Sequence, residues 1–174
     1  MLIGLVGKKG SGKDTLADFI VKEYSFVKYA YATPLKEACK ILFLLSDDQL
    51  HDRELKETID NRWDMTPRKM MQTMGTDLIR THIDPNFWIK HFSLWFKNNS
   101  EKNVIVTDCR FQNEIDIVIK LGGKIIKINR ETEFDEHESE VGIDKLQNID
   151  FIINNNSTKS NLFDQVKYYI NLKS

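Results

Sequence analysis

Apolar and polar residues follow one another along the chain in blocks that predict strands and helices in turn. Residues 2–6 (LIGLV) are a continuous apolar run bounded by glycine, which is typical of a strand buried on both faces. Over residues 13–24 the apolar positions recur at helical spacing and predict a helix. Residues 27–32 (VKYAYA) predict a second strand, and Pro34 suits the first turn of a helix over 34–45.

The middle of the chain carries two helix start signals. The Thr-Pro pair at 66–67 opens a helix, with Thr as N-cap and Pro at the first helical position, that runs to about residue 82 with an interruption near Gly75. The Asp-Pro pair at 84–85 opens a helix rich in aromatic residues. Residues 46–64 are polar and without a clear period, so the pattern assigns them no element.

The last third of the chain returns to alternating elements. Residues 103–107 (NVIVT) predict a strand ending before Asp108, and the helix that follows is stopped by the glycine pair at 122–123. Residues 124–129 (KIIKIN) predict a strand. A final strand and helix close the chain, at about 150–155 and 158–172.

Strands that alternate with helices predict an α/β fold. Right-handed crossovers then give a three-layer sandwich, with a mostly parallel central sheet of about five strands and helices on both faces. At 174 residues the chain is long enough for one domain, 1–174. Ligands bind beyond the carboxyl ends of strands in such sheets, and Gly7, Asp108 and Arg130 lie just past predicted strand ends.

Composition narrows the classes of function. The formal net charge of -1 offers no basic field for nucleic acid, which we therefore do not expect as a partner. The apolar start is too short for a signal peptide or a membrane span, so we expect no membrane association. Two cysteines far apart in sequence fit a reducing cytoplasm better than a disulfide scaffold.

The segment between the first strand and the first helix matches a phosphate-binding loop. Residues 7–13 (GKKGSGK) fit the pattern G-x-x-x-x-G-K in the required strand–loop–helix context. Backbone N–H groups in such a loop converge on phosphate oxygens, and the lysine bridges the β- and γ-phosphates of ATP. The predicted ATP contacts are Lys9, Gly10, Ser11, Gly12, Lys13, Asp14 and Thr15.

Asp14 departs from the usual loop, where a hydroxyl that holds Mg²⁺ follows the lysine. Thr15 supplies that hydroxyl one position later. Asp14 could hold Mg²⁺ directly or through water, or it could orient Lys13 or the acceptor. The plain alternative is an acid at a helix N-terminus, stabilised by the helix dipole by about 0.3–1 kcal/mol.

Charged residues also follow two later strands. Asp108 stands where P-loop enzymes keep a second acid that orders the water shell of Mg²⁺, and the guanidinium of Arg110 suits an acceptor phosphate. The structural alternative is that Asp108 caps the next helix while Arg110 pairs with Glu114. Arg130 could lie over the adenine or stabilise transferring charge, or it could be an ordinary surface arginine.

With these residues assembled, the chain resembles the deoxynucleoside monophosphate kinases of tailed bacteriophages, a family of P-loop kinases. The resemblance rests on GKKGSGKDTLADFI, YATPLKEA, TPRKMMQTMGTDLI before DPNFWIKHF, TDCRFQNEID with GGKIIKINR, and HESE. These segments run in order from residue 2 to 140, and the acid after the loop lysine belongs to the family pattern. The chain looks shorter than the phage enzymes, mostly between residues 45 and 65.

The resemblance implies transfer of the γ-phosphoryl group of ATP to a deoxynucleoside monophosphate, with Mg²⁺. It implies catalytic roles for Lys13, Asp14, Arg110 and Arg130, and Mg²⁺ ligation by Asp14 and Asp108. The substrate-binding residues that it implies are Lys36, Arg68, Gln72, Asp77, Trp88, Asp108 and Arg110.

Several of these substrate-binding residues have ordinary alternatives. Lys36 and Gln72 suit exposed helix positions, and Asp77 could pair with Arg80. Trp88 falls in an aromatic stripe that is more typical of a core.

Two segments carry further expectations. Residues 46–98 would form a helical insertion that binds the acceptor, and residues 131–148 a lid that excludes water. The acidic run in the second segment also fits a solvated loop, and the four histidines do not group at metal-ligand spacing.

Two other functions remain open at this point. One is a kinase for another phosphorylated small molecule, such as phosphomevalonate, whose family resembles this chain around GKKGSGKD, TPLKE and TDCR. The other is a regulatory module that binds ATP without transferring phosphate. Apolar side chains on the aromatic helix could also leave a patch for a homodimer.

Overall fold

A computed structural model describes residues 1–131 and 142–171 of the chain. The chain divides into two compact units, each described here by itself. The first unit contains residues 1–30 and 93–174 and holds the sheet. The second unit contains residues 31–92 and is helical. The predicted insertion at 46–98 overlaps the helical unit, and its role in acceptor binding stays a prediction.

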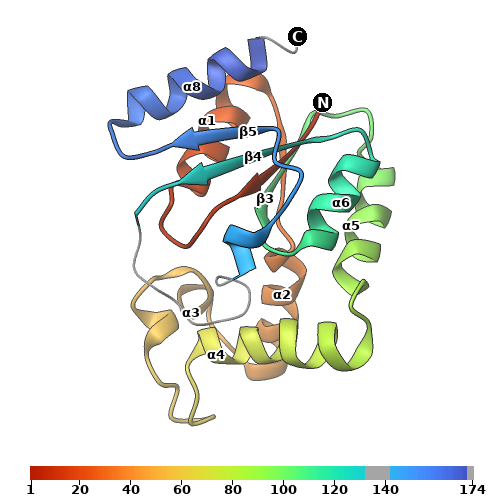
Figure 1. Cartoon of the computed structure of the whole chain (residues 1–174). Coiled ribbons are helices and arrows are strands. Elements are labelled where there is room, and N and C mark those ends of the chain that lie inside the picture. The colour runs from red at the N-terminus through yellow and green to blue at the C-terminus, as the bar shows by residue number, and fades with distance from the viewer. Residues whose placement is uncertain (132–141, 172–174) are drawn as a thin grey trace. The chain divides into compact units, whose positions relative to one another are not determined.

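The first unit is built on five parallel strands in the order β2-β3-β1-β4-β5 (Figure 1). This confirms the α/β sheet that the alternation of elements predicts. The strand at the centre is also the one that leads into the phosphate-binding loop, and its five residues are all buried. The strands are β1 (Leu2–Val6), β2 (Val27–Tyr29), β3 (Val104–Cys109), β4 (Lys124–Asn129) and β5 (Phe151–Asn154).

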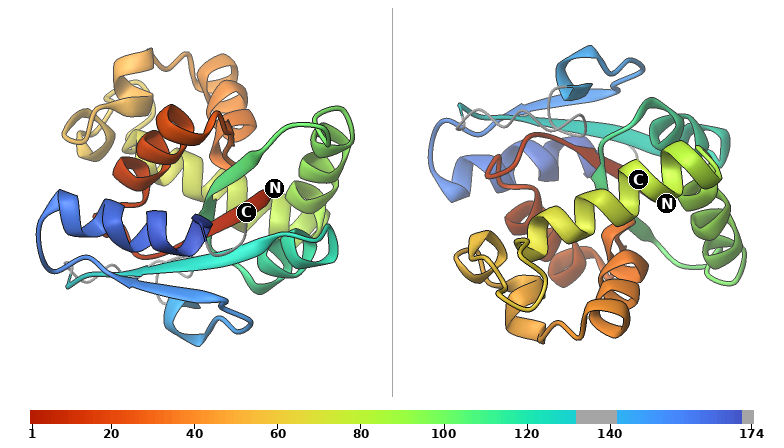
Figure 2. Two further views of the ribbon diagram at one scale, coloured as in Figure 1. Left: turned by 90° about the horizontal axis from the view of Figure 1, so that it is seen from above. Right: turned by 90° about the horizontal axis from the view of Figure 1, so that it is seen from below.

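Helices cover both faces of this sheet. On one face lie α1 (Lys13–Tyr24) and α8 (Lys159–Asn171), which Figure 2 shows side by side; Phe19 of α1 stacks on Phe163 of α8 with ring centroids 4.1 Å apart. On the other face lies α6 (Gln112–Lys120). Because alternate residues of a strand face opposite sides, Ile3 and Leu5 pack in the α1–α8 core while Gly4 faces α6. The sandwich thus has three layers.

The register between β1 and β3 shifts near the carboxyl end of the sheet. Gly4 pairs with Val106, but Val6 pairs with Cys109, so β3 has one more residue than β1 over this stretch. The predicted end of the strand at residue 107 is therefore wrong, since pairing continues through Cys109. Asp108 lies within this bulge, one residue before the pair of Cys109 with Val6 at the end of β1.

The helical unit contains five helical segments and most of a sixth. Three are α2 (Ala32–Phe43), α3 (Asp47–His51) and the 3-10 helix η1 (Leu55–Glu57); the others are α4 (Pro67–Gln72), the π-helix η2 (Thr73–Ile83) and α5 (Phe87–Lys97), which runs on into the first unit. Their core holds Cys39, Leu45, Leu50 and Met70.

Two predicted boundaries can be compared directly with this unit. The cap at Thr66 is confirmed, because its hydroxyl accepts from the N–H of Lys69 at 3.1 Å. The predicted strand over 27–32 ends at Tyr29 instead, and α2 already begins at Ala32. Pro34 is tolerated there because the first turn of a helix needs no N–H donor. The predicted interruption near Gly75 is a change of helix type, since α4 ends at Gln72 and the chain continues from Thr73 as the π-helix η2.

The remaining described element is the 3-10 helix η3 (Gly142–Lys145). Most of the predicted lid at 131–148, including the HESE segment, lies outside the described residues. Within 1–131 and 142–171, none of the helices is both long and apolar enough to cross a bilayer.

Candidate active site

The turn after β1 has the backbone that a phosphate-binding loop requires. Gly12 has φ 102° and ψ 12°, in the left-handed region, directly before Lys13 begins α1. A side chain would be strained in this conformation. Gly7 is needed for space, because a Cβ there would lie 2.6 Å from Oγ of Ser11 and 2.7 Å from the carbonyl oxygen of Ile128. Both glycines of the motif therefore have a physical reason.

The side chain of Lys13 lies inside this loop. Its ammonium donates to the carbonyl oxygen of Gly7 at 2.5 Å and to that of Lys8 at 2.7 Å. The residue is 7% exposed, so the charge is held in a site from which most water is excluded. The ammonium of Lys13 is thus bonded to two carbonyl oxygens of its own loop. The oxygens of a bound phosphate would accept the same hydrogen bonds.

The pKa of Lys13 shows which charges surround it. This pKa is lowered from 10.5 to about 8; burial is the main cause, and the nearby positive charge of Arg110 acts in the same direction. The carboxylates of Asp14 and Asp108 act in the opposite direction and raise it. The structure therefore brings four of the predicted catalytic and metal-binding residues into one electrostatic cluster.

Glu114 fixes the backbone that carries Arg110. Its carboxylate is 2% exposed and accepts from the N–H of Arg110 at 2.8 Å and from that of Phe111 at 3.1 Å. The helix α6 is thus capped from within by Glu114, and its N-cap residue is Phe111. The alternative in which Asp108 caps this helix is wrong, and Asp108 stays at the edge of the sheet beside Lys13.

Two more side chains, from residues that follow β4 and β5, contact carbonyl oxygens of the loop. Nη1 of Arg130 lies 3.5 Å from the carbonyl oxygen of Gly10, so this arginine reaches the loop tip. Nδ2 of Asn155, just after β5, donates to the carbonyl oxygen of Ser11 at 2.8 Å. The sequence analysis missed Asn155, because nothing in its local pattern relates it to a loop 144 residues earlier.

The loop fits a phosphate group. The Oγ atom of Ser11 is buried and has no hydrogen-bond partner within residues 1–131 and 142–171. A buried hydroxyl without a partner is costly, and a phosphate oxygen would satisfy it. The ammonium of Lys13 and the positive end of α1 would serve the same anion. The half-buried Lys9 and the exposed Gly10 lie at the loop tip.

The residues beside the loop also fit Mg²⁺, which prefers oxygen ligands. Asp14 is exposed in the first turn of α1, so its carboxylate can reach an ion that a triphosphate carries. Asp108 and Thr15 are partly buried and add a carboxylate and a hydroxyl. Carboxylate, hydroxyl and phosphate oxygens together are the donor set that this ion takes.

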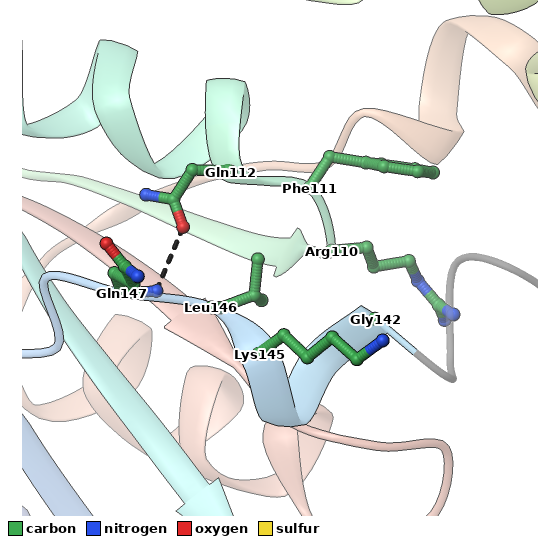
Figure 3. A pocket seen from close by; sticks show the side chains of 7 residues that line it. All are labelled: Arg110, Phe111, Gln112, Gly142, Lys145, Leu146 and Gln147. Atoms are coloured by element: carbon green, nitrogen blue, oxygen red, sulfur yellow. Dashed lines mark hydrogen bonds between the residues drawn. The ribbon is translucent and has the colours of Figure 1, made fainter.

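A pocket opens next to Arg110, between the start of α6 and η3 (Figure 3). It has a volume of about 430 Å³ and is lined by residues 110–112, 142 and 145–147. Gln112 joins its two sides, since its Oε1 accepts from the N–H of Gln147 at 2.9 Å. In Figure 3 the side chains of Arg110 and Lys145 extend in the same direction, so two positive charges border one opening.

The helix η3 is tied to the loop by ion pairs. Asp144 lies 2.6 Å from Nζ of Lys8 and 3.4 Å from Nζ of Lys127. These lysines hold the pKa of Asp144 below its ordinary value. These contacts place Asp144, in the described part of the predicted lid, beside the phosphate loop.

In the helical unit, three predicted substrate residues lie on α2 and α4, and two of them have polar neighbours. Nζ of Lys36 lies 3.4 Å from Nδ1 of His51 and lowers the pKa of that histidine. Nε of Arg68 donates to Glu57 at 2.5 Å, and Gln72 is partly buried at the end of α4. These contacts leave their roles toward an acceptor as predictions.

The other two predicted substrate residues lie further along the unit. Asp77 has Nζ of Lys69 at 3.6 Å, rather than Arg80, as its ion-pair partner. Trp88 is 6% exposed and its indole N–H donates to the carbonyl oxygen of Gly75 at 3.0 Å. Its polar atom is thus used inside the unit, and only its ring could serve a ligand.

Comparison with known proteins identifies the family. A model of the family described as deoxynucleotide monophosphate kinase matches residues 1–57 and 44–166. A relative from Acanthamoeba polyphaga mimivirus, named as a deoxynucleotide monophosphate kinase, is 43% identical over 181 residues, covering 95% of this chain and 94% of the relative. The chain belongs to the deoxynucleotide monophosphate kinase family. The resemblance seen in the sequence is thereby confirmed.

More distant relatives agree with this family. The deoxynucleotide monophosphate kinase of Enterobacteria phage T4 is 27% identical over 236 residues, covering 95% of this chain and 97% of the phage protein. Among solved structures, shikimate kinase from Aquifex aeolicus has a TM-score of 0.57 at 12% identity and covers 99% of this chain and 98% of its own. Dephospho-CoA kinase from Campylobacter jejuni has the same TM-score at 14% identity, with 99% and 96% covered. These similarities confirm the P-loop kinase type of fold.

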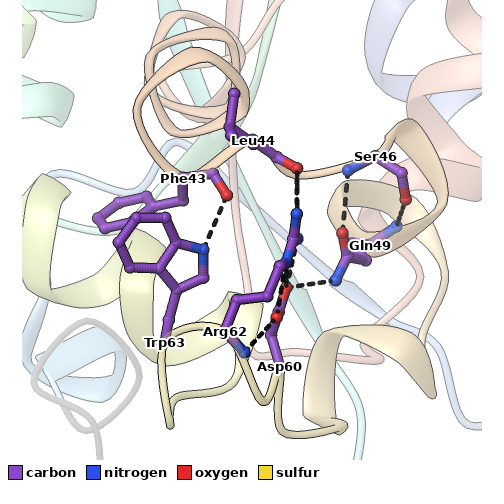
Figure 4. Close-up of polar contacts among 7 residues, drawn as sticks. All are labelled: Phe43, Leu44, Ser46, Gln49, Asp60, Arg62 and Trp63. Atoms are coloured by element: carbon purple, nitrogen blue, oxygen red, sulfur yellow. Dashed lines mark hydrogen bonds and ion pairs between the residues drawn. The ribbon is translucent and has the colours of Figure 1, made fainter.

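Residues 46–64, to which the sequence pattern assigned no element, are held by one cluster of polar contacts (Figure 4). Asp60 accepts from Nη2 of Arg62 at 2.6 Å and from Nε2 of Gln49 at 2.9 Å. Arg62 also donates to the carbonyl oxygen of Leu44, just past the end of α2, and the indole N–H of Trp63 donates to that of Phe43. Residues 46–64 therefore close the C-terminal end of α2.

Proposed function

We propose that this chain is a deoxynucleoside monophosphate kinase that transfers the γ-phosphoryl group of ATP to a deoxynucleoside monophosphate, giving ADP and a deoxynucleoside diphosphate. Membership of the family supports the acceptor class. The observation that carries the chemistry is the buried ammonium of Lys13 inside the loop, beside Asp14, Asp108 and Arg110.

The reaction needs little covalent participation from the protein. An oxygen of the acceptor phosphate attacks the γ-phosphorus of ATP, and the bond from that phosphorus to the β–γ bridging oxygen breaks, so the electron pair leaves with ADP. The acceptor phosphate is already an anion and requires no general base. The protein therefore acts by positioning two anions in line and by stabilising the charge that moves between them.

Each charged residue of the cluster has a place in this scheme. Lys13 leaves its loop carbonyls and holds the β- and γ-phosphates, while Arg110 holds the acceptor phosphate with its planar guanidinium. Asp14 and Asp108 would hold Mg²⁺ or its water shell, and the ion would supply positive charge that neutralises the triphosphate. Arg130 adds a positive charge at the loop tip.

The helical unit would recognise the sugar and base of the acceptor, through Lys36, Arg68, Gln72, Asp77 and Trp88. The pocket beside Arg110 offers a volume within the range of small-molecule sites. The lid at 131–148 would exclude water, which competes with the acceptor for the phosphoryl group. The two free cysteines fit work in a reducing cytoplasm, that of the host for a viral enzyme.

A coupled assay of ADP formation tests this proposal. The purified chain is given ATP and Mg²⁺ with each common nucleoside monophosphate, in deoxy and ribo forms, and with phosphomevalonate. We expect ADP release that depends on a deoxynucleoside monophosphate. Turnover on phosphomevalonate alone, or tight ATP binding with no acceptor-dependent ADP release, would reject the proposal in favour of the two other functions.

A further inference from the structure

Asn155 is held in place by the sheet and reaches the phosphate loop. Its backbone N–H donates to the carbonyl oxygen of Asn129 at 2.8 Å, which continues the pairing of β5 with β4 by one residue. Its side-chain Nδ2 donates to the carbonyl oxygen of Ser11 at 2.8 Å. A rigid strand end therefore carries the amide that contacts the loop.

The loop leaves room for this amide at one residue. A Cβ added to Gly12 would lie 2.4 Å from Nδ2 of Asn155, closer than real Cβ contacts occur. Gly12 also needs its left-handed φ of 102°. Glycine at position 12 thus has two reasons: it permits the left-handed turn into α1, and it leaves room for the side chain of Asn155.

The geometry of the peptide bond gives this contact a consequence. The described residues contain no cis peptide, so the carbonyl of Ser11 and the N–H of Gly12 point in opposite directions across one planar unit. Holding the carbonyl on one side fixes the direction of the N–H on the other. Within the described part of the chain, the N–H of Gly12 has no acceptor of its own.

We propose that Asn155 is a positioning residue of the phosphate loop, which holds the Ser11–Gly12 peptide so that the N–H of Gly12 is aimed at a phosphate of the nucleotide donor. The inference rests on the proposed function, since it needs a nucleotide in the loop. Asn155 itself touches neither the nucleotide nor the acceptor in this proposal.

This role predicts a particular kinetic pattern. A backbone N–H that contacts phosphate holds it equally in the bound and transition states, so its loss raises KM without lowering kcat. Loss of Asn155 would misdirect this N–H without removing it, so only part of its hydrogen bond to the charged phosphate is lost, and we expect binding to weaken by about three- to tenfold. We therefore expect Asn155→Ala and Asn155→Asp to raise KM for ATP by about this factor, with kcat and KM for the acceptor within about twofold of wild type.

The matched controls are Asn154→Ala and Asn154→Asp. Asn154 is the exposed preceding residue, and its backbone, not its side chain, bonds Gln165. The pair of Asp variants controls for added negative charge near the loop, and Asn155→Asp keeps the shape of the side chain while it removes the donor. Circular dichroism checks that each variant is folded.

Binding of ADP and of ATP, each measured by titration calorimetry with Mg²⁺ and without acceptor, supplies a readout apart from turnover. We expect both Asn155 variants to bind more weakly than both Asn154 variants. Wild-type affinity in Asn155→Asp, or a fall in kcat with unchanged KM, would overturn the inference. A wild-type chain that binds no nucleotide would instead reject the proposed function.

Discussion

The ammonium of Lys13 and the carbonyl oxygen of Gly7 lie 2.5 Å apart, so the lysine that is proposed to hold ATP also closes its own loop. A triphosphate that enters must replace Gly7 and Lys8 as the partners of this ammonium. The exchange is favourable because phosphate oxygens carry formal charge and the carbonyl oxygens do not. We therefore expect the backbone of the loop to stay as it is when a nucleotide binds, and the side chain of Lys13 to move.

This exchange predicts a dependence of ATP affinity on pH. Only the protonated lysine attracts phosphate, and the pKa of Lys13 in the free protein is about 8. Binding of the triphosphate raises that pKa, so the complex takes up a proton at high pH. Affinity should be steady below the free-protein pKa and should fall as pH rises through it, by up to about tenfold per pH unit.

Titration calorimetry from about pH 7.5 to about pH 9.5 checks this, in buffers of different ionisation enthalpy that report proton uptake. The variant Lys13→Met should bind ATP weakly at every pH in this range. A wild-type affinity that stays constant across the range would show that the ammonium does not exchange its partners.

Substitution of Asp14 tests its role toward Mg²⁺. The variant Asp14→Asn removes a carboxylate while it keeps the size of the side chain at the start of α1. We expect the Mg²⁺ concentration for half-maximal rate to rise by about tenfold or more, and Asp108→Asn to act in the same direction. If Asp14→Asn leaves the Mg²⁺ dependence unchanged, the acid only complements the helix dipole.

Substitution of Arg110 separates charge from geometry. We expect Arg110→Ala to lower kcat/KM for the acceptor by about 100-fold, because a charge on the migrating group is lost. Arg110→Lys should recover only a minor part, since an ammonium cannot form the paired contact of a guanidinium. Steady-state rates at varied acceptor concentration measure both. Full activity of Arg110→Lys would mean that a point charge suffices there.

Substitution of Asp60 tests the cluster that closes α2. Asp60 is 8% exposed, and the hydrogen bond from Arg62 is the main cause that holds its pKa far below the ordinary value. We expect Asp60→Asn to lower the midpoint of thermal unfolding, because its amide nitrogen would replace a carboxylate oxygen that accepts from Arg62, and the charge of the ion pair is lost. The matched control Asp64→Asn, at an exposed left-handed position that Asn tolerates, should change little.

The pH dependence of this difference has a definite sign. A carboxyl group whose folded pKa is lowered contributes stability above its unfolded pKa and loses that contribution as pH falls through the folded pKa. The gap between wild type and Asp60→Asn should therefore be full at neutral pH and should shrink only in strong acid. Unfolding curves followed by circular dichroism measure it. A gap that vanishes already near the ordinary Asp pKa would contradict the contacts of Asp60.

The parts of the fold that follow local rules were predictable from the sequence. The apolar run of β1, the glycines of the loop and the cap at Thr66 each depend on residues within a few positions of one another. The pattern also indicated that Asp108 and Arg130 would lie at one edge of the sheet, since parallel strands share their carboxyl ends. These local signals were enough to place the phosphate loop and the charges around it.

The features that the sequence analysis did not predict depend on contacts between residues far apart in the chain. The order of residues 46–64 comes from Arg62, which donates to a carbonyl 18 residues earlier, and no period in the segment records this. The role of Asn155 depends on a loop at the other end of the chain. Strand β3 outlasts its apolar run because Cys109 pairs with Val6 across a bulge. The strand was predicted to end before Asp108 only because that residue is polar.

The place of β1 in the middle of the sheet has a consequence for how long the loop keeps its form. Its amide protons are enclosed by β3 and β4 and should be among the last in the chain to exchange with heavy water. Since Gly7 follows the last of these residues directly, the root of the loop can open only when the sheet itself does. The backbone of the loop would then keep its conformation through repeated turnover, and only side chains would rearrange between catalytic cycles.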